Sequence, residues 1–177
     1  GDPHYGTFDS LKQDFQGQCE YVLNRQGGCD ADKDSDGLVS MSGESDFEIQ
    51  VRNGKGWGGR NSAVTTTGAV AIGLPGSGTV LELHRGTQVN VHKIDGIAIG
   101  AAQMPYTDAG SEATVAWASG VPSALVTVTI PSFPAVVTRD GSMRVTVKAP
   151  TTSTMFGNAC GRCGNFDGSV ESNDMTR

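Results

Sequence analysis

The stretch Phe47-Glu48-Ile49-Gln50-Val51 alternates apolar and polar side chains, and the same two-residue period returns along much of the chain. Alternation of this kind places one face of a β-strand against a core and the other face in water. The other segments that share the period hold Val89 and Val91, Val115 and Trp117, Val126, Val128 and Ile130, and Val145 and Val147. About ten such strands, with no segment of helical period, predict an all-β fold, either a sandwich or a barrel.

Dipeptides that favour tight turns separate these segments. They are Asn53-Gly54, Gly58-Gly59, Pro75-Gly76, Asp95-Gly96 and Asp140-Gly141. We expect Asp95-Gly96 to join residues 89–94 to 97–99, and Asp140-Gly141 to join residues 136–137 to 145–147. The Thr-, Gly- and Ala-rich stretch 65–78 is weakly patterned and fits either an edge strand or a long loop. No linker divides the sequence, so residues 1–177 are predicted to form a single domain.

Composition excludes two classes of partner. The formal net charge is −6, whereas a nucleic-acid partner requires a clustered basic surface. No run approaches the roughly eighteen apolar residues of a membrane-spanning segment, so we expect no membrane insertion by this chain. The chain opens on Gly1-Asp2-Pro3 without a signal peptide, which we interpret as the start of an excised fragment.

Cysteines and oxygen-bearing side chains gather near the C-terminal end. The block reads Cys160-Gly161-Arg162-Cys163-Gly164-Asn165-Phe166-Asp167-Gly168 and is followed by Asn173-Asp174. A C-x-x-C pair alone is typical of zinc binding or thiol exchange. No helix-period segment follows Cys163, however, and the spacing of Cys19 and Cys29 is poor for a zinc knuckle. Structural disulfides formed in an oxidising compartment fit these cysteines better.

The two ends of the chain together resemble a known family. The segments Gly1–Tyr5, Thr7–Asp9 and Phe15–Leu23 look like the opening of a von Willebrand factor type D (VWD) domain, and the block at 160–168 with Asn173-Asp174 looks like its closing signature. The resemblance implies an antiparallel β-sandwich, stabilised by calcium, in a secreted or cell-surface protein. It also implies assembly or adhesion with other extracellular protein modules or subunits rather than enzymatic activity.

The resemblance further implies a Ca²⁺ ion held between the two ends. The family's ligands map onto Asp9, Asn165, Asp167, Asn173 and Asp174, with a backbone carbonyl near Ser169 as a further ligand. The residue types suit the ion, because calcium takes six to eight oxygens from carboxylates, amides and carbonyls. The alternative is an Asx-rich turn whose side chains bond to their own backbone.

The same resemblance gives the cysteines partners. It pairs Cys29 with Cys160, whereas the family partners of Cys19 and Cys163 lie outside this chain. Cys19 and Cys163 are then either free or joined to each other, and we expect a Cys19–Cys163 bridge as the weaker of the two pairings.

The opening segment raises a different function. In some relatives the Asp-Pro bond of the Gly-Asp-Pro-His motif cleaves itself. Here the Asp2 carboxyl group can attack its own carbonyl to form a cyclic anhydride, and the tertiary amide of Pro3 leaves more easily than an ordinary amide. His4 can assist the proton transfer, since an imidazole exchanges protons near neutral pH. The alternative to such a self-processing domain is an ordinary turn at Asp2-Pro3.

An acidic stretch provides a second candidate for calcium. Asp32-Lys33-Asp34-Ser35-Asp36-Gly37 matches the start of an EF-hand loop, but position twelve is Gly43 and the acidic Glu44 falls one residue late. The candidate ligands are Asp30, Asp32, Asp34, Asp36 and Glu44. The family resemblance does not predict this site, so a second calcium ion and a solvated acidic loop both remain open.

Catalytic motifs are otherwise absent from the sequence. His84 and His92 have no serine or cysteine partner in a nucleophile motif. A secreted enzyme such as a light-emitting oxidase that carries a VWD domain is a weaker alternative, because no active-site signature is recognisable.

Overall fold

A computed structural model of the chain describes residues 4–7, 10, 12–14, 19–26, 47–55, 65–84, 89–92, 97–99, 103–117, 125–131, 135–139, 144–148 and 159–160. This part of the chain is built from strands. They are β1 (His4–Gly6), β2 (Lys12–Asp14), β3 (Glu20–Gln26), β4 (Glu48–Lys55), β5 (Thr65–Gly73), β6 (Val80–His84), β7 (Val89–His92), β8 (Ile97–Ile99), β9 (Tyr106–Thr107), β10 (Thr114–Trp117), β11 (Val126–Ile130), β12 (Ala135–Arg139), β13 (Val145–Lys148) and β14 (Ala159–Cys160).

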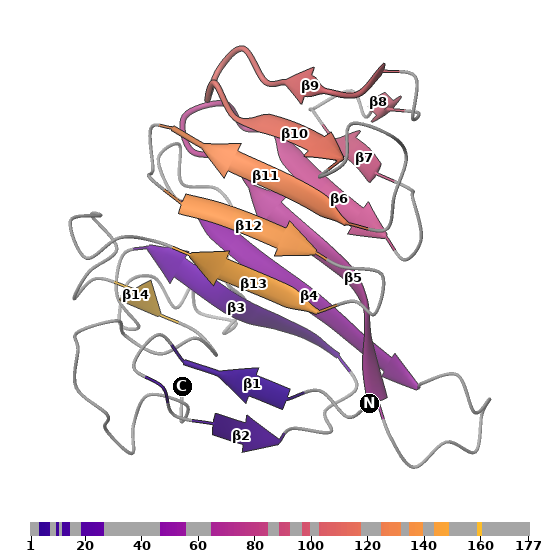
Figure 1. Cartoon of the computed structure of the whole chain (residues 1–177), viewed down its shortest axis with the longest axis vertical. Helices are drawn as coiled ribbons and strands as arrows, with labels where there is room; N and C mark the ends of the chain where they lie inside the picture. The colour runs from indigo at the N-terminus through magenta and orange to yellow at the C-terminus, as the bar shows by residue number, and fades with distance from the viewer. Residues whose placement is uncertain are drawn as a thin grey trace, which may run out of the picture.

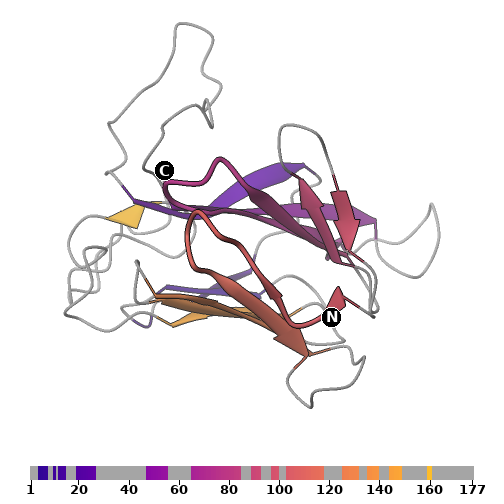
Figure 2. The same cartoon turned by 90° about the horizontal axis from the view of Figure 1, so that it is seen from above.

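The strands form two large antiparallel sheets and one small hairpin. The seven-stranded sheet has the order β14-β3-β4-β5-β6-β7-β8, the five-stranded sheet has the order β13-β12-β11-β10-β9, and β1 pairs with β2. The two large sheets overlap in Figure 1, and the view from above in Figure 2 shows them as two layers. The predicted all-β antiparallel fold is confirmed, and the layers make it a sandwich. No helix in the described residues has the length and apolar character needed to cross a bilayer.

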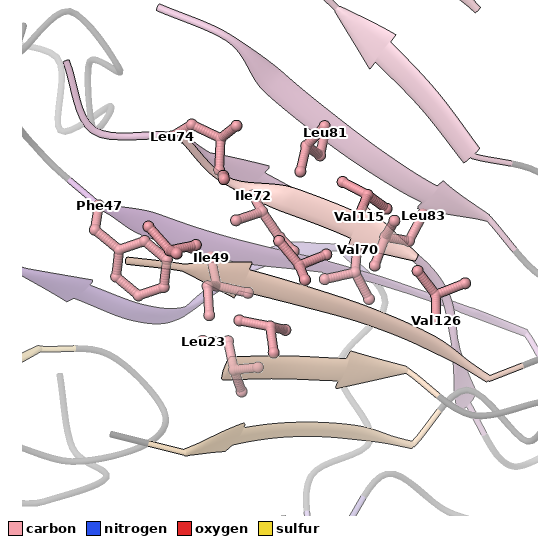
Figure 3. Close-up of a cluster of buried hydrophobic side chains, with 14 of the residues drawn as sticks. Leu23, Phe47, Ile49, Val70, Ile72, Leu74, Leu81, Leu83, Val115 and Val126 are labelled. Atoms are coloured by element: carbon pink, nitrogen blue, oxygen red, sulfur yellow. The ribbon is translucent and has the colours of Figure 1, made fainter. Parts of the chain in front are cut away.

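The hydrophobic core lies between the two layers (Figure 3). Ile49, Ile72 and Leu81 of the seven-stranded sheet and Val115 and Val128 of the five-stranded sheet are all fully buried in one cluster. Each is the inward member of an alternating strand. Burial of such a side chain contributes about 1.5–3 kcal/mol relative to exposure, so the two apolar faces are sufficient reason for the sheets to stack.

Two of the predicted hairpins are confirmed by the strand pairing. β7 pairs with β8 across the Asp95-Gly96 segment, and β12 pairs with β13 across the Asp140-Gly141 segment. The dipeptides themselves lie outside the described residues, as does Gly58-Gly59. At Pro75-Gly76 the turn itself is seen: Leu74 N donates to Thr79 O at 2.9 Å, and Gly76 has a φ of +72°, a conformation that glycine adopts without steric cost.

The stretch 65–78 is neither an edge strand nor a long loop. Its first nine residues form β5, which lies in the middle of the seven-stranded sheet between β4 and β6. Val70 and Ile72 are fully buried in the core, while the alternate positions Ala69 and Ala71 carry only a methyl group. Small residues at the alternate positions weaken the contrast between the two faces, and the sequence pattern is correspondingly faint.

Asn53-Gly54 was expected to form a turn, and this prediction is wrong. Both residues lie inside β4, where the register with β5 shifts between Arg52 and Asn53. Such a β-bulge re-aims the side chains that follow it. The Asn53 side chain is buried and hydrogen-bonded, so tertiary contacts prevail over the local preference of Asn-Gly for a turn.

A buried carboxylate joins the two sheets at one end of the sandwich. Asp108, in the turn between β9 and β10, is fully buried. Thr79, directly before β6, donates from Oγ1 to Asp108 Oδ1 at 2.8 Å. Ser111 N and Oγ each donate to Asp108 Oδ2 at 2.9 Å. Burial alone would raise the pKa of Asp108, but the hydrogen bonds from Thr79, Ser111 and Ser77 outweigh it and hold the pKa well below its usual range.

Candidate functional site

The last described strand lies beside one of the first. β14 pairs with β3 in antiparallel register, with Ala159 opposite Gln26 and Cys160 opposite Arg25. This pairing puts residues from both ends of the chain on one edge of the seven-stranded sheet, the edge at the lower left of Figure 1. We call β3, β14 and the nearby β1–β2 hairpin the terminal edge.

The register at the terminal edge suits the predicted Cys29–Cys160 disulfide. Cys160 lies opposite Arg25, and Cys29 follows Arg25 by four residues in the sequence. Four residues span at most about 14 Å. A disulfide requires Cα atoms about 4.4–6.8 Å apart, which is well within that tether. Cys29 itself lies outside the described residues, so the bridge stays a prediction.

The β1–β2 hairpin is fastened to the seven-stranded sheet through a buried tyrosine. Tyr5, in β1, is 8% exposed and belongs to the hydrophobic core. Asn53 Nδ2 donates to Tyr5 Oη at 2.7 Å, and Thr67 Oγ1 of β5 donates to Asn53 Oδ1 at 3.2 Å. Asn53 N also donates to Cys19 O at 2.8 Å. The bulge in β4 therefore holds both the hairpin and the segment that leads into β3.

On the exposed side of the hairpin, His4 contacts Asp14. These residues are direct partners in the β1–β2 register, and His4 Nδ1 lies 2.6 Å from Asp14 Oδ1. A protonated Nδ1 donates to the carboxylate, which leaves Nε2 facing away from Asp14. His4 directly follows the Asp2-Pro3 bond in the sequence, although Asp2 and Pro3 lie outside the described residues.

Cys19 is exposed and forms no disulfide with a residue that the structure describes. Its proposed partner Cys163 lies outside the described residues, so this weaker pairing also stays a prediction. The side chain of Cys160 is likewise not described, and only its backbone position in β14 is known.

The predicted calcium ligands fall outside the part of the chain that the structure describes. This holds for Asp9, Asn165, Asp167, Ser169, Asn173 and Asp174, and for Asp30, Asp32, Asp34, Asp36 and Glu44 of the acidic stretch. Asp9 lies between Thr7 and Ser10, where Ser10 N donates to Thr7 O at 3.2 Å. Within the described residues, His, Cys, Asp and Glu side chains form no group of three or more that could hold a metal ion.

Comparison with known proteins agrees with this architecture. The family model of the von Willebrand factor type D domain matches residues 1–177. IgGFc-binding protein of Homo sapiens is 32% identical over 168 residues, which is 94% of this chain and 3% of that protein. SCO-spondin of Rattus norvegicus is 31% identical over 175 residues, 99% of this chain and 3% of that protein. Alpha-tectorin of Homo sapiens is 26% identical over 168 residues, 94% of this chain and 6% of that protein.

The all-β sandwich with its paired ends is thus a module of extracellular proteins. The chain belongs to the von Willebrand factor type D domain family. The relatives are secreted, matrix or cell-surface proteins, and the chain shares that extracellular location. It spans only 3% to 6% of the length of these relatives.

Three contacts at the terminal edge and in the core were missed by sequence reasoning. Tyr5 and Asn53 are 48 positions apart, and no local pattern links them. Asp14 was absent from the candidate set, although a hairpin that pairs residue 4 with residue 14 could have been sought around the intervening Gly6–Lys12 segment. Asp108 gave no signal, because an isolated aspartate three residues before Ser111 has the appearance of an ordinary turn residue.

Proposed function

We propose that this VWD domain is a calcium-stabilised module for protein assembly or adhesion outside the cell. One observation carries the proposal: β14 pairs with β3, so that Cys160, the first residue of the closing signature, lies opposite Arg25, two residues after the opening segment ends at Leu23. Fastening the two ends together fixes the surface that neighbouring modules or subunits contact. The partners are other extracellular protein modules or subunits, since the relatives are multidomain proteins of which one domain is a small part.

Calcium would link the two ends of the chain. The ligand set Asp9, Asn165, Asp167, Asn173 and Asp174, with a carbonyl near Ser169, offers oxygen donors only, as a hard cation requires. Support from the structure is indirect: residue 160 lies beside β3, and Asn165 follows it by five residues. The ion would cross-link chain segments that are distant in sequence, and thereby stabilise the folded form alone.

Melting of the purified chain with calcium and with excess chelator tests this proposal. Chelation should lower the melting temperature, and added calcium should restore it while magnesium does not. Asp167→Asn should abolish the calcium response, and Asp34→Asn should leave it unchanged if the acidic stretch is a solvated loop. A partial loss in Asp34→Asn would instead support the second calcium site. An unchanged melting temperature at every chelator concentration would refute a structural ion.

A disulfide between Cys29 and Cys160 would be the second link between the two ends of the chain. Closing a loop of roughly 130 residues contributes on the order of 4–5 kcal/mol in the chain-entropy treatment. Thiol counting on the unreduced, denatured chain tests both pairings. Two reactive thiols would leave Cys19 and Cys163 free, and none would favour the Cys19–Cys163 bridge. Four would reject the Cys29–Cys160 bridge.

Assembly itself is tested by sedimentation velocity of the unreduced chain, with calcium and with chelator. We expect larger species in calcium if the fastened terminal edge presents a self-contacting surface. A monomer at every concentration would reject self-association, and binding to different extracellular modules would then be the remaining form of assembly.

A second candidate function is self-processing at the Asp2-Pro3 bond. The contact of 2.6 Å between His4 and Asp14 supports it, because the contact orients the imidazole ring of the residue that follows Pro3 in the sequence. The candidate reaction is hydrolysis of one peptide bond through a cyclic anhydride. Mass spectrometry after incubation at mildly acidic pH should detect loss of the Gly1-Asp2 dipeptide. An intact N-terminus after long incubation would reject this function.

A further inference from the structure

We propose that the outer face of the five-stranded sheet binds a sulfated polysaccharide of the extracellular space. The outer face is the side of β9–β13 that is turned away from the hydrophobic core. The assembly proposed above concerns the terminal edge of the other sheet, so this binding activity is a separate one and does not depend on it.

Threonine side chains share this face in two rows. They are Thr107, Thr114 and Thr129 across β9, β10 and β11, and Thr127, Thr138 and Thr146 across β11, β12 and β13. Directly paired residues lie on the same face of a sheet, and Val115 and Val128, which alternate with them, are buried in the core. All six threonines are exposed or half-buried. In Figure 1 the five-stranded sheet lies nearest the viewer, with its outer face forward.

These hydroxyl groups differ in their surroundings from other threonines of the chain. Thr67 and Thr79 give their hydroxyl protons to the side chains of Asn53 and Asp108 within the protein. The six on the outer face reach solvent instead. A hydroxyl group both donates and accepts hydrogen bonds, so the two rows can bond to the hydroxyl and sulfate oxygens of a sugar chain.

The charges on this sheet are basic, although the chain as a whole has a formal net charge of −6. Residues 113–159 contain Arg139, Arg144 and Lys148 and a single acidic residue, Asp140. Arg144 and Lys148 are exposed, and the two-residue period of a strand places them with Thr146 on the outer face. The described strands β9–β13 contain no acidic residue. An anionic ligand therefore meets attraction here without a competing carboxylate from these strands.

The outer face of the seven-stranded sheet provides a contrast. Its exposed cation Arg52 lies 2.7 Å from Glu20 and 4.0 Å from Glu82. Carboxylates of the protein itself thus balance that guanidinium group, and an approaching sulfate would be repelled by them. Charge complementarity therefore assigns an anionic ligand to the five-stranded sheet.

The spacing of the two cations indicates the shape of the ligand. Arg144 and Lys148 are four residues apart on a strand, which separates their Cα atoms by about 13 Å. A polymer with repeated sulfate groups can lie along β13 and contact both cations, while the hydroxyl groups of Thr138 and Thr146 bond to the sugar between them. Sulfated polysaccharides are polymers of this kind in the extracellular space where the relatives occur.

Calorimetric titration of the full chain with a heparin oligosaccharide tests the proposal. We expect binding at low ionic strength that weakens as salt is added, because exposed ion pairs are screened. Arg144→Gln combined with Lys148→Gln should weaken binding by about tenfold, since an exposed ion pair contributes a factor of up to about five. Lys12→Gln is the matched control: Lys12 is exposed on β2, outside this sheet, and its loss should leave the affinity unchanged.

The hydroxyl groups are tested by Thr138→Val combined with Thr146→Val, which keeps the branched shape of both side chains. Loss of two hydrogen bonds should weaken heparin binding by about threefold or more, whereas Thr66→Val on the other sheet should have no effect. Unchanged affinity in the double valine variant would overturn the role of the hydroxyl groups. Melting temperatures of all variants should match that of the wild type, so that a change in affinity reports the surface and not the fold.

Three results would overturn the proposal as a whole. One is the absence of heparin binding at low ionic strength, and another is an equal loss of affinity in Lys12→Gln. The third is binding to vesicles of phosphatidylcholine and phosphatidylserine that is as tight as binding to heparin, which would assign the face to an anionic lipid surface. Weak binding of desulfated heparin, by contrast, is the expected result, because the cations then lose their partners.

Discussion

Asn53 of β4 donates a hydrogen bond of 2.7 Å to the hydroxyl group of Tyr5 in β1, across 48 positions of sequence. Its amide oxygen accepts a second hydrogen bond from Thr67 of β5. One buried amide therefore links the N-terminal hairpin to two strands of the seven-stranded sheet. The bulge between Arg52 and Asn53 makes this possible, because it turns the Asn53 side chain towards the hairpin.

Removal of the Tyr5 hydroxyl group should destabilise the fold. Tyr5→Phe leaves the Asn53 amide without an acceptor in a buried place, so we expect the free energy of unfolding to fall by about 1–3 kcal/mol. Thr67→Val should lower the free energy of unfolding similarly, because it leaves the Asn53 amide oxygen without its donor. Urea denaturation measures both. Thr66→Val is the matched control, because Thr66 is paired with Gly54 instead of Asn53 and successive side chains of a strand lie on opposite faces. A loss as large in Thr66→Val as in Thr67→Val would contradict the assigned network.

Replacement of Asp108 should weaken the link between the two sheets. Asp108→Asn exchanges an acceptor oxygen for a donor that faces the hydroxyl groups of Thr79 or Ser111. We expect the free energy of unfolding at neutral pH to fall by about 1.5–3 kcal/mol, the range for hydrogen bonds to a charged group. Chemical denaturation at pH 7 measures this loss.

The Asp108 carboxylate should also make the free energy of unfolding depend on pH in a definite direction. Folding lowers the pKa of Asp108 below its ordinary value of 3.8, so the contribution of Asp108 to stability is complete above that pH and is lost as the pH falls further. The stability difference between the wild type and Asp108→Asn should therefore be largest at neutral pH and shrink below about pH 4. Glu112→Gln, in the same turn but exposed, is the control. A difference that grows on acidification would contradict the sign.

Gly110 allows the β9–β10 turn to approach the β5–β6 turn closely. A Cβ atom built on Gly110 would lie 2.6 Å from Ser77 Cβ, closer than real side chains come. Gly110→Ala should cost about 1–3 kcal/mol, as other overpacking substitutions do. Gly54→Ala is the control, since a Cβ there meets no atom of the described residues within 4 Å. Thermal unfolding of the two variants should separate them clearly, and equal melting temperatures would reject the close approach.

Asn24 of β3 has a fully buried side chain whose amide nitrogen and oxygen have no hydrogen-bond partner among the residues that the structure describes. Such groups cost about 1–3 kcal/mol each in a folded protein. Asn24→Leu, which is similar in size, should therefore raise the free energy of unfolding in urea. Asn53→Leu provides the contrast, because that amide is bonded on both sides and its loss should destabilise. A lower stability of Asn24→Leu would show that its amide is satisfied in solution.

Alternation of side chains was sufficient to predict the strands that carry the core. Ile49 and Val51, and Val126 with Val128, are buried where the period places them. The pattern failed where local preference and tertiary contacts disagree. Asn53-Gly54 favours a turn locally but is drawn into β4 by the buried contacts of Asn53, and β5 was obscured by small residues on alternate positions.

The candidate site was predictable only to the level of its family. The opening and closing motifs identified the VWD family, and the β3–β14 pairing agrees with ends that meet. The individual contacts were not predictable, because they depend on register. Asp14 contacts His4 because the β1–β2 register pairs residue 4 with residue 14. A shift of this register by one residue would move Asp14 to the other face of the hairpin.

Strand order has a consequence for how the domain folds. Among the described strands, every neighbouring pair joins consecutive strands of the chain except β14 and β3. Hairpins between consecutive strands close short loops and form early, whereas a pairing that closes a long loop costs more chain entropy and forms late. Both sheets can thus be nearly complete before β14 arrives. Docking of β14 then requires that the chain has been synthesised at least as far as residue 160. A chain truncated before β14 would keep the other strand pairs and leave β3 at the edge of its sheet.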